Sequence, residues 1–373
     1  MFLCSSAEMQ GLTVSAIWVA MFATTFHVVL SSSWLSKVAA ALLCTIVASV
    51  LMKAGAALLF PRRFVSDDRE QRSKLAVFIT GCDSGFGNLC ARRLDALGFR
   101  VFAGCLAASS PAARDLSAGT SNRLQLVQCN VTDEKQVAEA TDTVKVSLQD
   151  SRLISLINNA GITSVSFVEL TPVEQYRRLL EVNCLGAVRV TQAMLPLLSQ
   201  SAGHGQVTSH MSSRVVFVSS ISGNNFIPYI SAYSMSKAAL NAFAGVLRKE
   251  IGRFNVSTHV ISPPGYRTAL TETGTIDRLL TENWSRCKEE VKQRYTHELF
   301  QSSKEKYLTF LEKALLPASR SGEVVDDMID AAVGLRPQML YVPSVGAKLR
   351  SWVYPLLPVC VLDWLVTNVA QLD

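Results

Sequence analysis

A short apolar segment that leads into a glycine-rich turn and then into a helical pattern constrains this chain most. Leu75–Thr80 has the composition of a buried strand, residues 81–87 follow the spacing Gly-x-x-x-Gly-x-Gly, and Leu89, Leu94 and Leu97 continue at helical spacing. Backbone N–H groups at the start of such a helix can bind a pyrophosphate. A turn that only interrupts structure is the alternative. We predict a dinucleotide site here.

A second feature is a tyrosine and a lysine four residues apart, Tyr233 and Lys237, which follow Ser220 by thirteen and seventeen residues. Residues at this spacing lie on one face of a helix. A phenol has a pKa of roughly 10, and a nearby ammonium favours its ionised form. With a hydroxyl to hold the substrate oxygen, the pair can move a proton to or from an alcohol. Alone, the pair would fit an ordinary amphipathic helix equally well.

Apolar strands and helical patterns alternate along the chain after residue 74, which predicts a single Rossmann-type α/β fold with a doubly wound parallel sheet. A polar stretch at 199–213 is expected to be a surface loop. The expected strands after the first are 100–106, 124–129, 154–158, 214–219 and 256–262, and the longest expected helices are 173–198 and 231–253.

Two apolar stretches near the N-terminus are long enough to cross a bilayer core of about 30 Å. Residues 11–34 contain no Asp, Glu, Lys or Arg, and residues 38–60 contain only Lys53. A signal peptide or mitochondrial transit peptide is disfavoured because no basic residue precedes the first stretch. We therefore predict a membrane anchor at 1–61, with two transmembrane helices, or one.

Positive charge follows the anchor, in a linker at 62–74 that contains Arg62, Arg63, Arg69, Arg72 and Lys74, whereas residues 1–10 contain no Lys or Arg. The positive-inside rule places the following domain in the cytosol, and the cluster would suit an anionic leaflet. The endoplasmic reticulum is the expected membrane.

Composition excludes several classes of function. The chain of 373 residues has 49% hydrophobic and 18% charged residues with a net charge of +6, but no basic stripe interleaved with aromatic residues, so no nucleic-acid partner is expected. Nine scattered cysteines without a Cys-x-x-Cys pair, and no histidine cluster, predict neither a disulfide framework nor a metal site.

Several motifs in one order resemble the short-chain dehydrogenase/reductase family: Thr80-Gly81-x-x-x-Gly85-x-Gly87, Asn158-Asn159-Ala160-Gly161, Asn183, Ser220, Tyr233, Lys237 and Pro264-Gly265. The amino-acid sequence at 81–87, 98–106 and 156–161 is similar to that of one branch of the family. This branch contains 17β- and 11β-hydroxysteroid dehydrogenases type 2, retinol dehydrogenases and D-β-hydroxybutyrate dehydrogenases. The resemblance covers residues 74–270 strongly. It implies a dehydrogenase domain at 75–345 with a lid at about 266–320, and a homodimer.

The resemblance also implies catalytic roles. Tyr233 would be the general acid/base, and Lys237 would lower its pKa and hold the nicotinamide ribose. Ser220 would orient the substrate oxygen, with Ser219 and Ser222 as rival hydroxyls. Asn183 would order a water that relays protons, or alternatively cap a helix kink.

The cofactor contacts implied by the resemblance are Thr80, Gly81, Asp83, Ser84, Gly85, Phe86, Gly87, Asn130, Val131, Asn159, Ala160, Gly161, Tyr233, Lys237, Pro264, Gly265 and Thr268. For Asn159 the alternative is a turn that stabilises the sheet. Thr268 lies four residues beyond Pro264, where the family pattern has five, which weakens its assignment. Arg267 beside it could reach an acidic group on the substrate or cofactor.

The cofactor predicted is NAD rather than NADP. NADP sites commonly place Arg or Lys in the glycine turn or after the second strand. Here the turn carries Asp83 and the second strand ends without a cation, although the acid that usually selects NAD there is also missing. NAD in the cytosol favours oxidation of the alcohol.

The leading hypothesis is therefore a membrane-anchored, NAD-dependent dehydrogenase of a lipophilic secondary alcohol, with a hydroxysteroid as the preferred substrate. Retinol, 3-hydroxybutyrate and a non-catalytic cofactor-binding scaffold are the alternatives. The C-terminal segment 346–373 is apolar but interrupted by two prolines and an aspartate. It is expected to contact the membrane or form a substrate entrance, or else to be a plain core segment.

Overall fold

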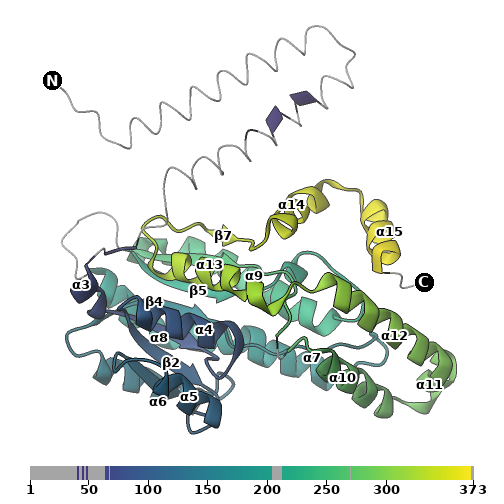
Figure 1. The fold of residues 1–373 in the computed structure, drawn as a ribbon, viewed down its shortest axis with the longest axis horizontal. Coiled ribbons are helices and arrows are strands. Elements are labelled where there is room, and N and C mark those ends of the chain that lie inside the picture. The colour runs from purple at the N-terminus through teal and green to yellow at the C-terminus, as the bar shows by residue number, and fades with distance from the viewer. Residues whose placement is uncertain are drawn as a thin grey trace. The chain divides into compact units, whose positions relative to one another are not determined.

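Seven parallel strands form one sheet, in the order β3-β2-β1-β4-β5-β6-β7 (Figure 1). In β1 the side chains of Leu75, Val77 and Ile79 pack on one face of the sheet, and those of Ala76 and Phe78 pack on the other. Both faces are covered, which explains why the strands are apolar along their whole length. The strands are β1 Leu75–Thr80, β2 Arg100–Cys105, β3 Leu124–Gln128, β4 Arg152–Asn158, β5 Ser213–Val218, β6 Val256–Ile261 and β7 Leu340–Tyr341.

The computed structural model describes residues 64–66, 68–203, 212–268 and 270–370, together with positions 40, 41, 44, 45 and 48. The apolar stretch 11–34 lies outside the described residues, as do most of 38–60 and residues 204–211 of the expected loop. Within the described part, no helix combines the length and apolar character needed to cross a bilayer.

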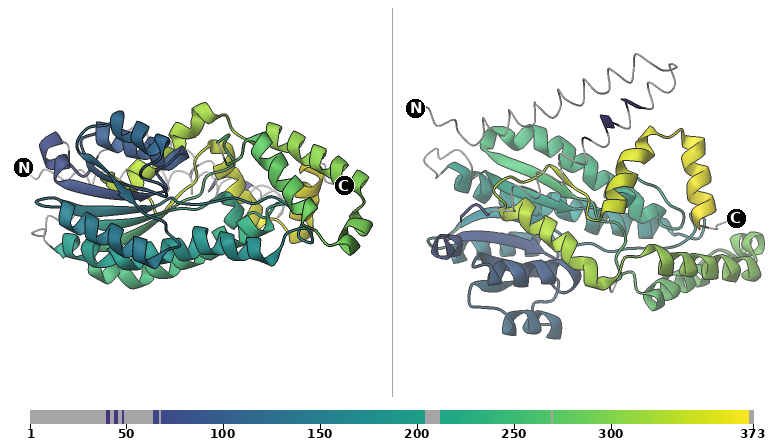
Figure 2. Two further views of the ribbon diagram at one scale, coloured as in Figure 1. Left: turned by 90° about the horizontal axis from the view of Figure 1, so that it is seen from below. Right: turned by 45° about the horizontal axis from the view of Figure 1, so that its top comes forward.

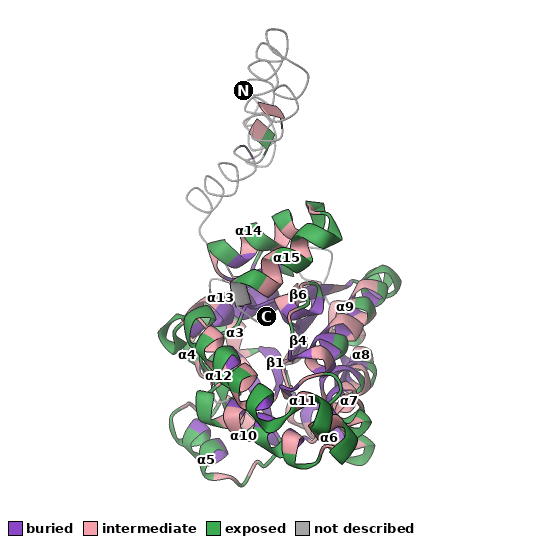
Figure 3. Cartoon of the chain, turned by 90° about the vertical axis from the view of Figure 1, so that its right-hand side faces the viewer, coloured by how far each residue is buried: buried purple, intermediate pink, exposed green. Residues whose placement is uncertain are grey.

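Helices cover both faces of the sheet (Figure 2). On one side, α4, α5 and α13 bury apolar residues against the strands, and on the other α6, α8 and α9 do so. Figure 3 shows buried strands between helices whose outer sides are exposed. The helices are α4 Gly85–Ala96, α5 Pro111–Ala118, α6 Glu134–Ser147, α8 Gly186–Gly203, α9 Ser231–Ile251 and α13 Gly322–Val333.

The single long helix predicted at 173–198 is wrong in one respect. The chain forms α7 (Val173–Leu180), then one π-helical segment, η1 (Glu181–Leu185), and only then α8. A π-turn inserts a residue that an apolar period does not reveal, and such turns often occur at functional sites. Asn183 lies inside it. The seventh strand, β7, was not predicted, because two residues carry no pattern.

The polar segment after β6 is helical, as the sequence suggested, and contains α10 (Thr273–Ser285), α11 (Glu289–Tyr295) and α12 (His297–Ala314). These helices lie together at one end of the sheet (Figures 1 and 2). Trp284 stacks on the buried ring of Phe300 with 4.5 Å between the ring centroids. Buried residues of α10 and α12 form one apolar cluster with Val165 and Ile230 from loops at the edge of the sheet. This cluster packs the three-helix segment against that end of the sheet.

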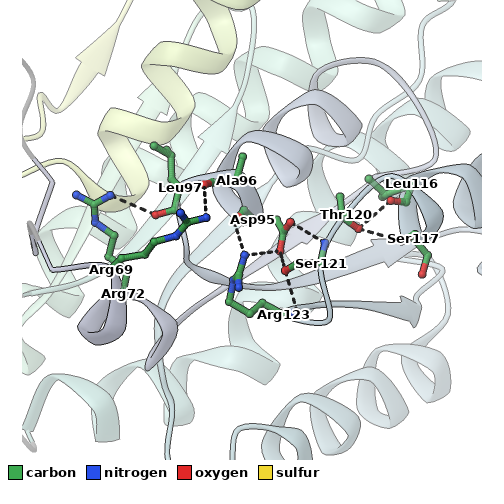
Figure 4. A network of polar contacts seen from close by, with 10 residues as sticks. All are labelled: Arg69, Arg72, Asp95, Ala96, Leu97, Leu116, Ser117, Thr120, Ser121 and Arg123. Atoms are coloured by element: carbon green, nitrogen blue, oxygen red, sulfur yellow. Dashed lines mark hydrogen bonds and ion pairs between the residues drawn. The ribbon is translucent and has the colours of Figure 1, made fainter.

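Two arginines of the expected linker form hydrogen bonds with the folded domain. Arg69 lies on α3 (Arg69–Ser73), and its guanidinium donates to the carbonyl of Ala96 at 3.3 Å. The Arg72 guanidinium donates to the carbonyl of Leu97 at 3.2 Å, and Figure 4 shows both side chains at the end of α4. Cations satisfy the last carbonyls of a helix and complement its dipole.

The folded unit begins at Phe64, ahead of the expected domain start at residue 75. Phe64 forms an antiparallel bridge with Gly334, and the Val65 amide donates to the carbonyl of Val333 at 2.9 Å. The ring of Phe64 also packs edge-on against Phe99. Much of the expected linker 62–74 is therefore packed against the domain.

The C-terminal segment forms α14 (Val345–Val353), a short 3₁₀ turn, η5 (Tyr354–Leu356), and α15 (Val359–Ala370). The alternative that 346–373 is a plain core segment is wrong. Among those of its residues whose burial is described, only Ala347 is buried. Large apolar side chains are exposed along it: Val345, Leu349, Val353, Leu356, Val359, Val361 and Trp364.

Candidate active site

The strand order diverges between β1 and β4, and a crevice outside the carboxyl ends of these strands is where doubly wound folds bind ligands. A cavity of 1490 Å³ lies there. It is lined by every predicted site residue except Thr80, Gly87 and Asn183. Those three residues lie behind the residues that line it.

The glycine turn depends on missing side chains. A Cβ on Gly81, whose φ is +71°, would lie 2.8 Å from the Cα of Ala160. A Cβ on Gly87 would lie 2.4 Å from the carbonyl oxygen of Gly81. Gly85 has φ +61° and open space where its Cβ would be. Two glycines thus allow close packing, and the third leaves room on the cavity side.

Thr80 and Asn159 join this turn to the end of β4. The Thr80 hydroxyl accepts from the backbone amides of Asn159 and Ala160 at 3.0 and 3.1 Å. The Asn159 amide donates to the carbonyls of Thr80 and Gly81 at 2.9 and 3.1 Å. The side chain of Asn159 therefore stabilises the turn, as the alternative interpretation proposed. Asn159 also lines the cavity.

The first turn of α4 fits an anionic group. Its N-cap residue, Ser84, makes no capping hydrogen bond, whereas Ser110 caps α5 and Asp133 caps α6. The first N–H groups of a helix need acceptors, and a phosphate supplies them. Because the glycine turn also leaves open space at Gly85, the residues present fit a dinucleotide diphosphate.

Asp83 has a defined place in the cavity wall. Its carboxylate accepts from the backbone amides of Leu106 and Ala107, at 2.8 and 3.2 Å, just beyond the end of β2. These bonds hold a negative charge beside the point where the ribose-binding acid of a dinucleotide fold usually lies.

Tyr233 lies in the first turn of α9, and its hydroxyl is hydrogen-bonded to the Ser220 side chain. Burial raises the pKa of Tyr233 above its ordinary value, and this hydrogen bond lowers it in part. The Ser219 hydroxyl instead donates to the carbonyl of Lys237 at 3.4 Å. Among the rival serines, the geometry favours Ser220.

Lys237 lies one helical turn below, only 4% exposed. Its ammonium donates to the carbonyl of Val218 at 2.9 Å and lies 5.7 Å from the centroid of the Tyr233 ring. Burial lowers the pKa of Lys237 to about 8. The ammonium thus lies beside the face of the Tyr233 ring, and burial disfavours its charged form.

Asn183 is buried behind Gly161. Its side-chain oxygen accepts from the Ile162 amide at 2.8 Å, and its side-chain nitrogen donates to the Ile162 carbonyl at 2.9 Å. It thus links the π-turn to the loop after β4. These bonds agree with the alternative in which Asn183 stabilises a helix kink, and the proton-relay role that the resemblance implies stays a prediction.

The loop after β6 departs from expectation at one residue. Gly265 approaches the lid so closely that a Cβ there would lie 2.5 Å from Leu315. Thr268 lines the cavity, with its amide bonded to the Thr271 hydroxyl at 2.9 Å. Arg267 does not line it, because its guanidinium donates to the carbonyl of Glu312 at 2.9 Å. The suggested contact of Arg267 with a substrate or cofactor acid is therefore not supported.

Several cavity residues were missed from the sequence. Tyr266 packs edge-on against Phe86, and its place beside Pro264-Gly265 could have suggested it. The sequence offered a substrate entrance as one interpretation of 346–373, but it did not single out the individual C-terminal contributors, whose place in the cavity wall depends on tertiary packing. They are Ser344, Gly346, Arg350, Tyr354, Leu365 and Val366.

The sequence model of the short chain dehydrogenase family matches residues 75–278. The chain belongs to the short-chain dehydrogenase family. It is an oxidoreductase, and the family uses a nicotinamide cofactor. This dehydrogenase is 36% identical to 17-beta-hydroxysteroid dehydrogenase type 6 of Bos taurus, covering 78% of the chain and 87% of that protein.

Two further relatives fall in the branch predicted from the motifs. Estradiol 17-beta-dehydrogenase 2 of Mus musculus is 32% identical over 78% of the chain and 74% of its own length. The 11-beta-hydroxysteroid dehydrogenase type 2 of Ovis aries is 35% identical over 76% of the chain and 64% of its own length.

Solved structures agree on the fold. A short-chain dehydrogenase from Streptomyces avermitilis aligns with a TM-score of 0.55 and 23% identity, over 76% of this chain and 96% of that one. A second, from Burkholderia cenocepacia in complex with NADP, aligns with a TM-score of 0.54 and 20% identity, over 75% and 92%.

The pKa of Lys237 leads to a test in the cofactor-free protein. Because burial lowers this pKa from 10.5 to about 8, the folded state binds fewer protons than the unfolded state between these pH values. The free energy of unfolding should therefore rise with pH across that window, relative to Lys237→Met, by about 3 kcal/mol at about 1.4 kcal/mol per pKa unit. Urea unfolding of both proteins measures this difference. Parallel pH curves would contradict it.

Proposed function

We propose that this dehydrogenase oxidises a lipophilic secondary alcohol with NAD, and that its substrate is a hydroxysteroid. The observation that carries the proposal is one continuous cavity, lined by the glycine turn, by Ser220, Tyr233 and Lys237, and by apolar residues of the lid. Such a cavity brings a nucleotide, a proton-transfer pair and a hydrophobic pocket together.

The proton chemistry follows from the side chains. Ser220 would hold the alcohol oxygen, and Tyr233 as phenolate would take its proton. Lys237, whose ammonium lies 5.7 Å from the centroid of the Tyr233 ring, would favour that phenolate and would contact the nicotinamide ribose. When bound, NAD supplies the hydride acceptor. The glycine turn, the first turn of α4 and Asn159 to Gly161 would hold it.

The substrate wall supports a lipophilic alcohol. Its apolar lining comes from loops, the lid and the C-terminal segment: Val165, Ile227, Ile230, Ile276, Tyr307, Phe310, Leu311, Leu365 and Val366. The relatives that carry hydroxysteroid or estradiol in their names support a steroid. Retinol fits the same wall and remains the second candidate. The small acid 3-hydroxybutyrate stays a further alternative, because the cations Arg178 and Arg350 line the cavity although Arg267 does not.

The membrane arrangement belongs to the same proposal. The segment 1–61 would anchor the chain in the endoplasmic reticulum membrane, with the domain at 75–345 in the cytosol. The exposed apolar side chains of 346–373 would contact the bilayer beside the cavity that this segment helps to line. Exposed Met235 and Val246 on α9 would suit a homodimer.

The catalytic part is tested with membranes that carry the protein, NAD or NADP, and a panel of 17β- and 11β-hydroxysteroids, retinol and 3-hydroxybutyrate. NADH appearance with a steroid should fall by about 10³-fold in Tyr233→Phe, because general acid–base catalysis is lost. The variant should still bind NADH, measured by fluorescence titration.

The matched control is Tyr176→Phe, which removes a hydroxyl bonded to Ser231 outside the cavity and should retain activity. Full activity of Tyr233→Phe would overturn the assigned chemistry. Silence across the panel, with NADH still bound, would favour an unlisted lipid alcohol or the non-catalytic scaffold.

The NAD preference is tested at Asp83. In Asp83→Asn the negative charge held by the Leu106 and Ala107 amides is lost, so the 2′-phosphate of NADP meets less repulsion. The ratio of kcat/KM for NADP to that for NAD should rise about tenfold. Asp115→Asn, which changes an exposed carboxylate paired with Arg92, is the control and should leave the ratio unchanged. A wild type that prefers NADP would refute the assignment.

The membrane arrangement is tested in microsomes. The full chain should stay with the membrane pellet after alkaline carbonate extraction, and a variant lacking residues 1–61 should be more extractable, since the predicted spans are removed. An added protease should digest the catalytic domain in intact microsomes. Protection of that domain until detergent is added would contradict the cytosolic orientation.

A further inference from the structure

Ser236 connects the catalytic helix to the π-turn. It lies on α9 between Tyr233 and Lys237 and is fully buried. Its hydroxyl donates to the backbone carbonyl of Tyr233 at 2.7 Å. Because that proton is used, the oxygen faces Asn183 as an acceptor, and the Asn183 side-chain nitrogen donates to it at 2.9 Å.

The three bonds of Asn183 have one consistent polarity. Its nitrogen uses both hydrogens, one toward Ser236 and one toward the Ile162 carbonyl, and its oxygen accepts from the Ile162 amide. A flipped amide would direct its NH₂ group at the Ile162 N–H and its oxygen at the Ile162 carbonyl. Ser236 is the only side chain among these partners.

The oriented amide faces the same small space as the catalytic lysine. A Cβ on Gly161 would lie 3.3 Å from the side-chain oxygen of Asn183 and 3.6 Å from the ammonium of Lys237. Glycine leaves that space open. Asn183, whose side chain is bonded to the Ile162 backbone, thus lies beside Lys237 across this space.

We propose that Ser236 is a positioning residue for proton transfer: it holds the Asn183 side chain, and with it the π-turn η1, beside Lys237. This inference rests on the proposed function, in which Lys237 supports Tyr233. A serine that bonds the carbonyl three residues back is common in helices and would by itself serve only the helix. The second bond, to a buried amide on another element, is what assigns the positioning role.

The test compares Ser236→Ala with Ser236→Thr and Ser234→Ala in the full chain. Thr keeps a hydroxyl that can bond the same carbonyl. Ser234 is a buried serine on the same helix whose hydroxyl has no partner, so it controls for the loss of a buried oxygen. In Ser236→Ala, kcat should fall about tenfold with the KM for NAD unchanged, since only proton transfer is affected. Ser236→Thr should restore it, and Ser234→Ala should match the wild type.

A second measurement does not depend on turnover. Hydrogen exchange of the Ile162 amide, which Asn183 holds, should be faster in cofactor-free Ser236→Ala and unchanged in Ser234→Ala. If the wild type oxidises none of the alcohols, the proposed function fails. Hydrogen exchange then still reports whether Ser236 holds the Asn183 side chain. Unchanged kcat and exchange in Ser236→Ala would overturn the inference, as would a loss of kcat that Thr does not restore.

Discussion

The close approach of the glycine turn to the end of β4 is the contact on which the site depends. Gly81 and Gly87 allow it, since a Cβ on either would lie under 3 Å from a neighbouring atom. Thr80 and Asn159 then hold it with four hydrogen bonds. This contact directs the first turn of α4 at the crevice between β1 and β4, so the glycine turn and helix α9 line one cavity.

Burial sets the electrostatics of that cavity. The hydroxyl of Tyr233 and the ammonium of Lys237 are both removed from water, which disfavours the charged form of each. The ionisation of both groups is therefore sensitive to small changes of position. The π-turn and the hydrogen bonds of Asn183 are the parts of the fold that restrict such changes.

The far end of the cavity is built differently. Aromatic stacking in the lid, such as Trp284 on Phe300, gives α10 and α12 a core of their own. The ring of Tyr233 packs against this cluster. Tyr354, Leu365 and Val366 add a third wall from the C-terminal segment. Substrate fit thus depends on elements that carry no motif.

The sequence by itself determined the parallel α/β fold, six of the seven strands to within two residues at either end, and the Ser220, Tyr233 and Lys237 group, because apolar runs and local spacing encode them. Only the tertiary structure decided the π-turn around Asn183, the roles of Arg69 and Arg72 at the end of α4, and the C-terminal wall. These depend on contacts between residues far apart in the chain, for which a local period leaves no record.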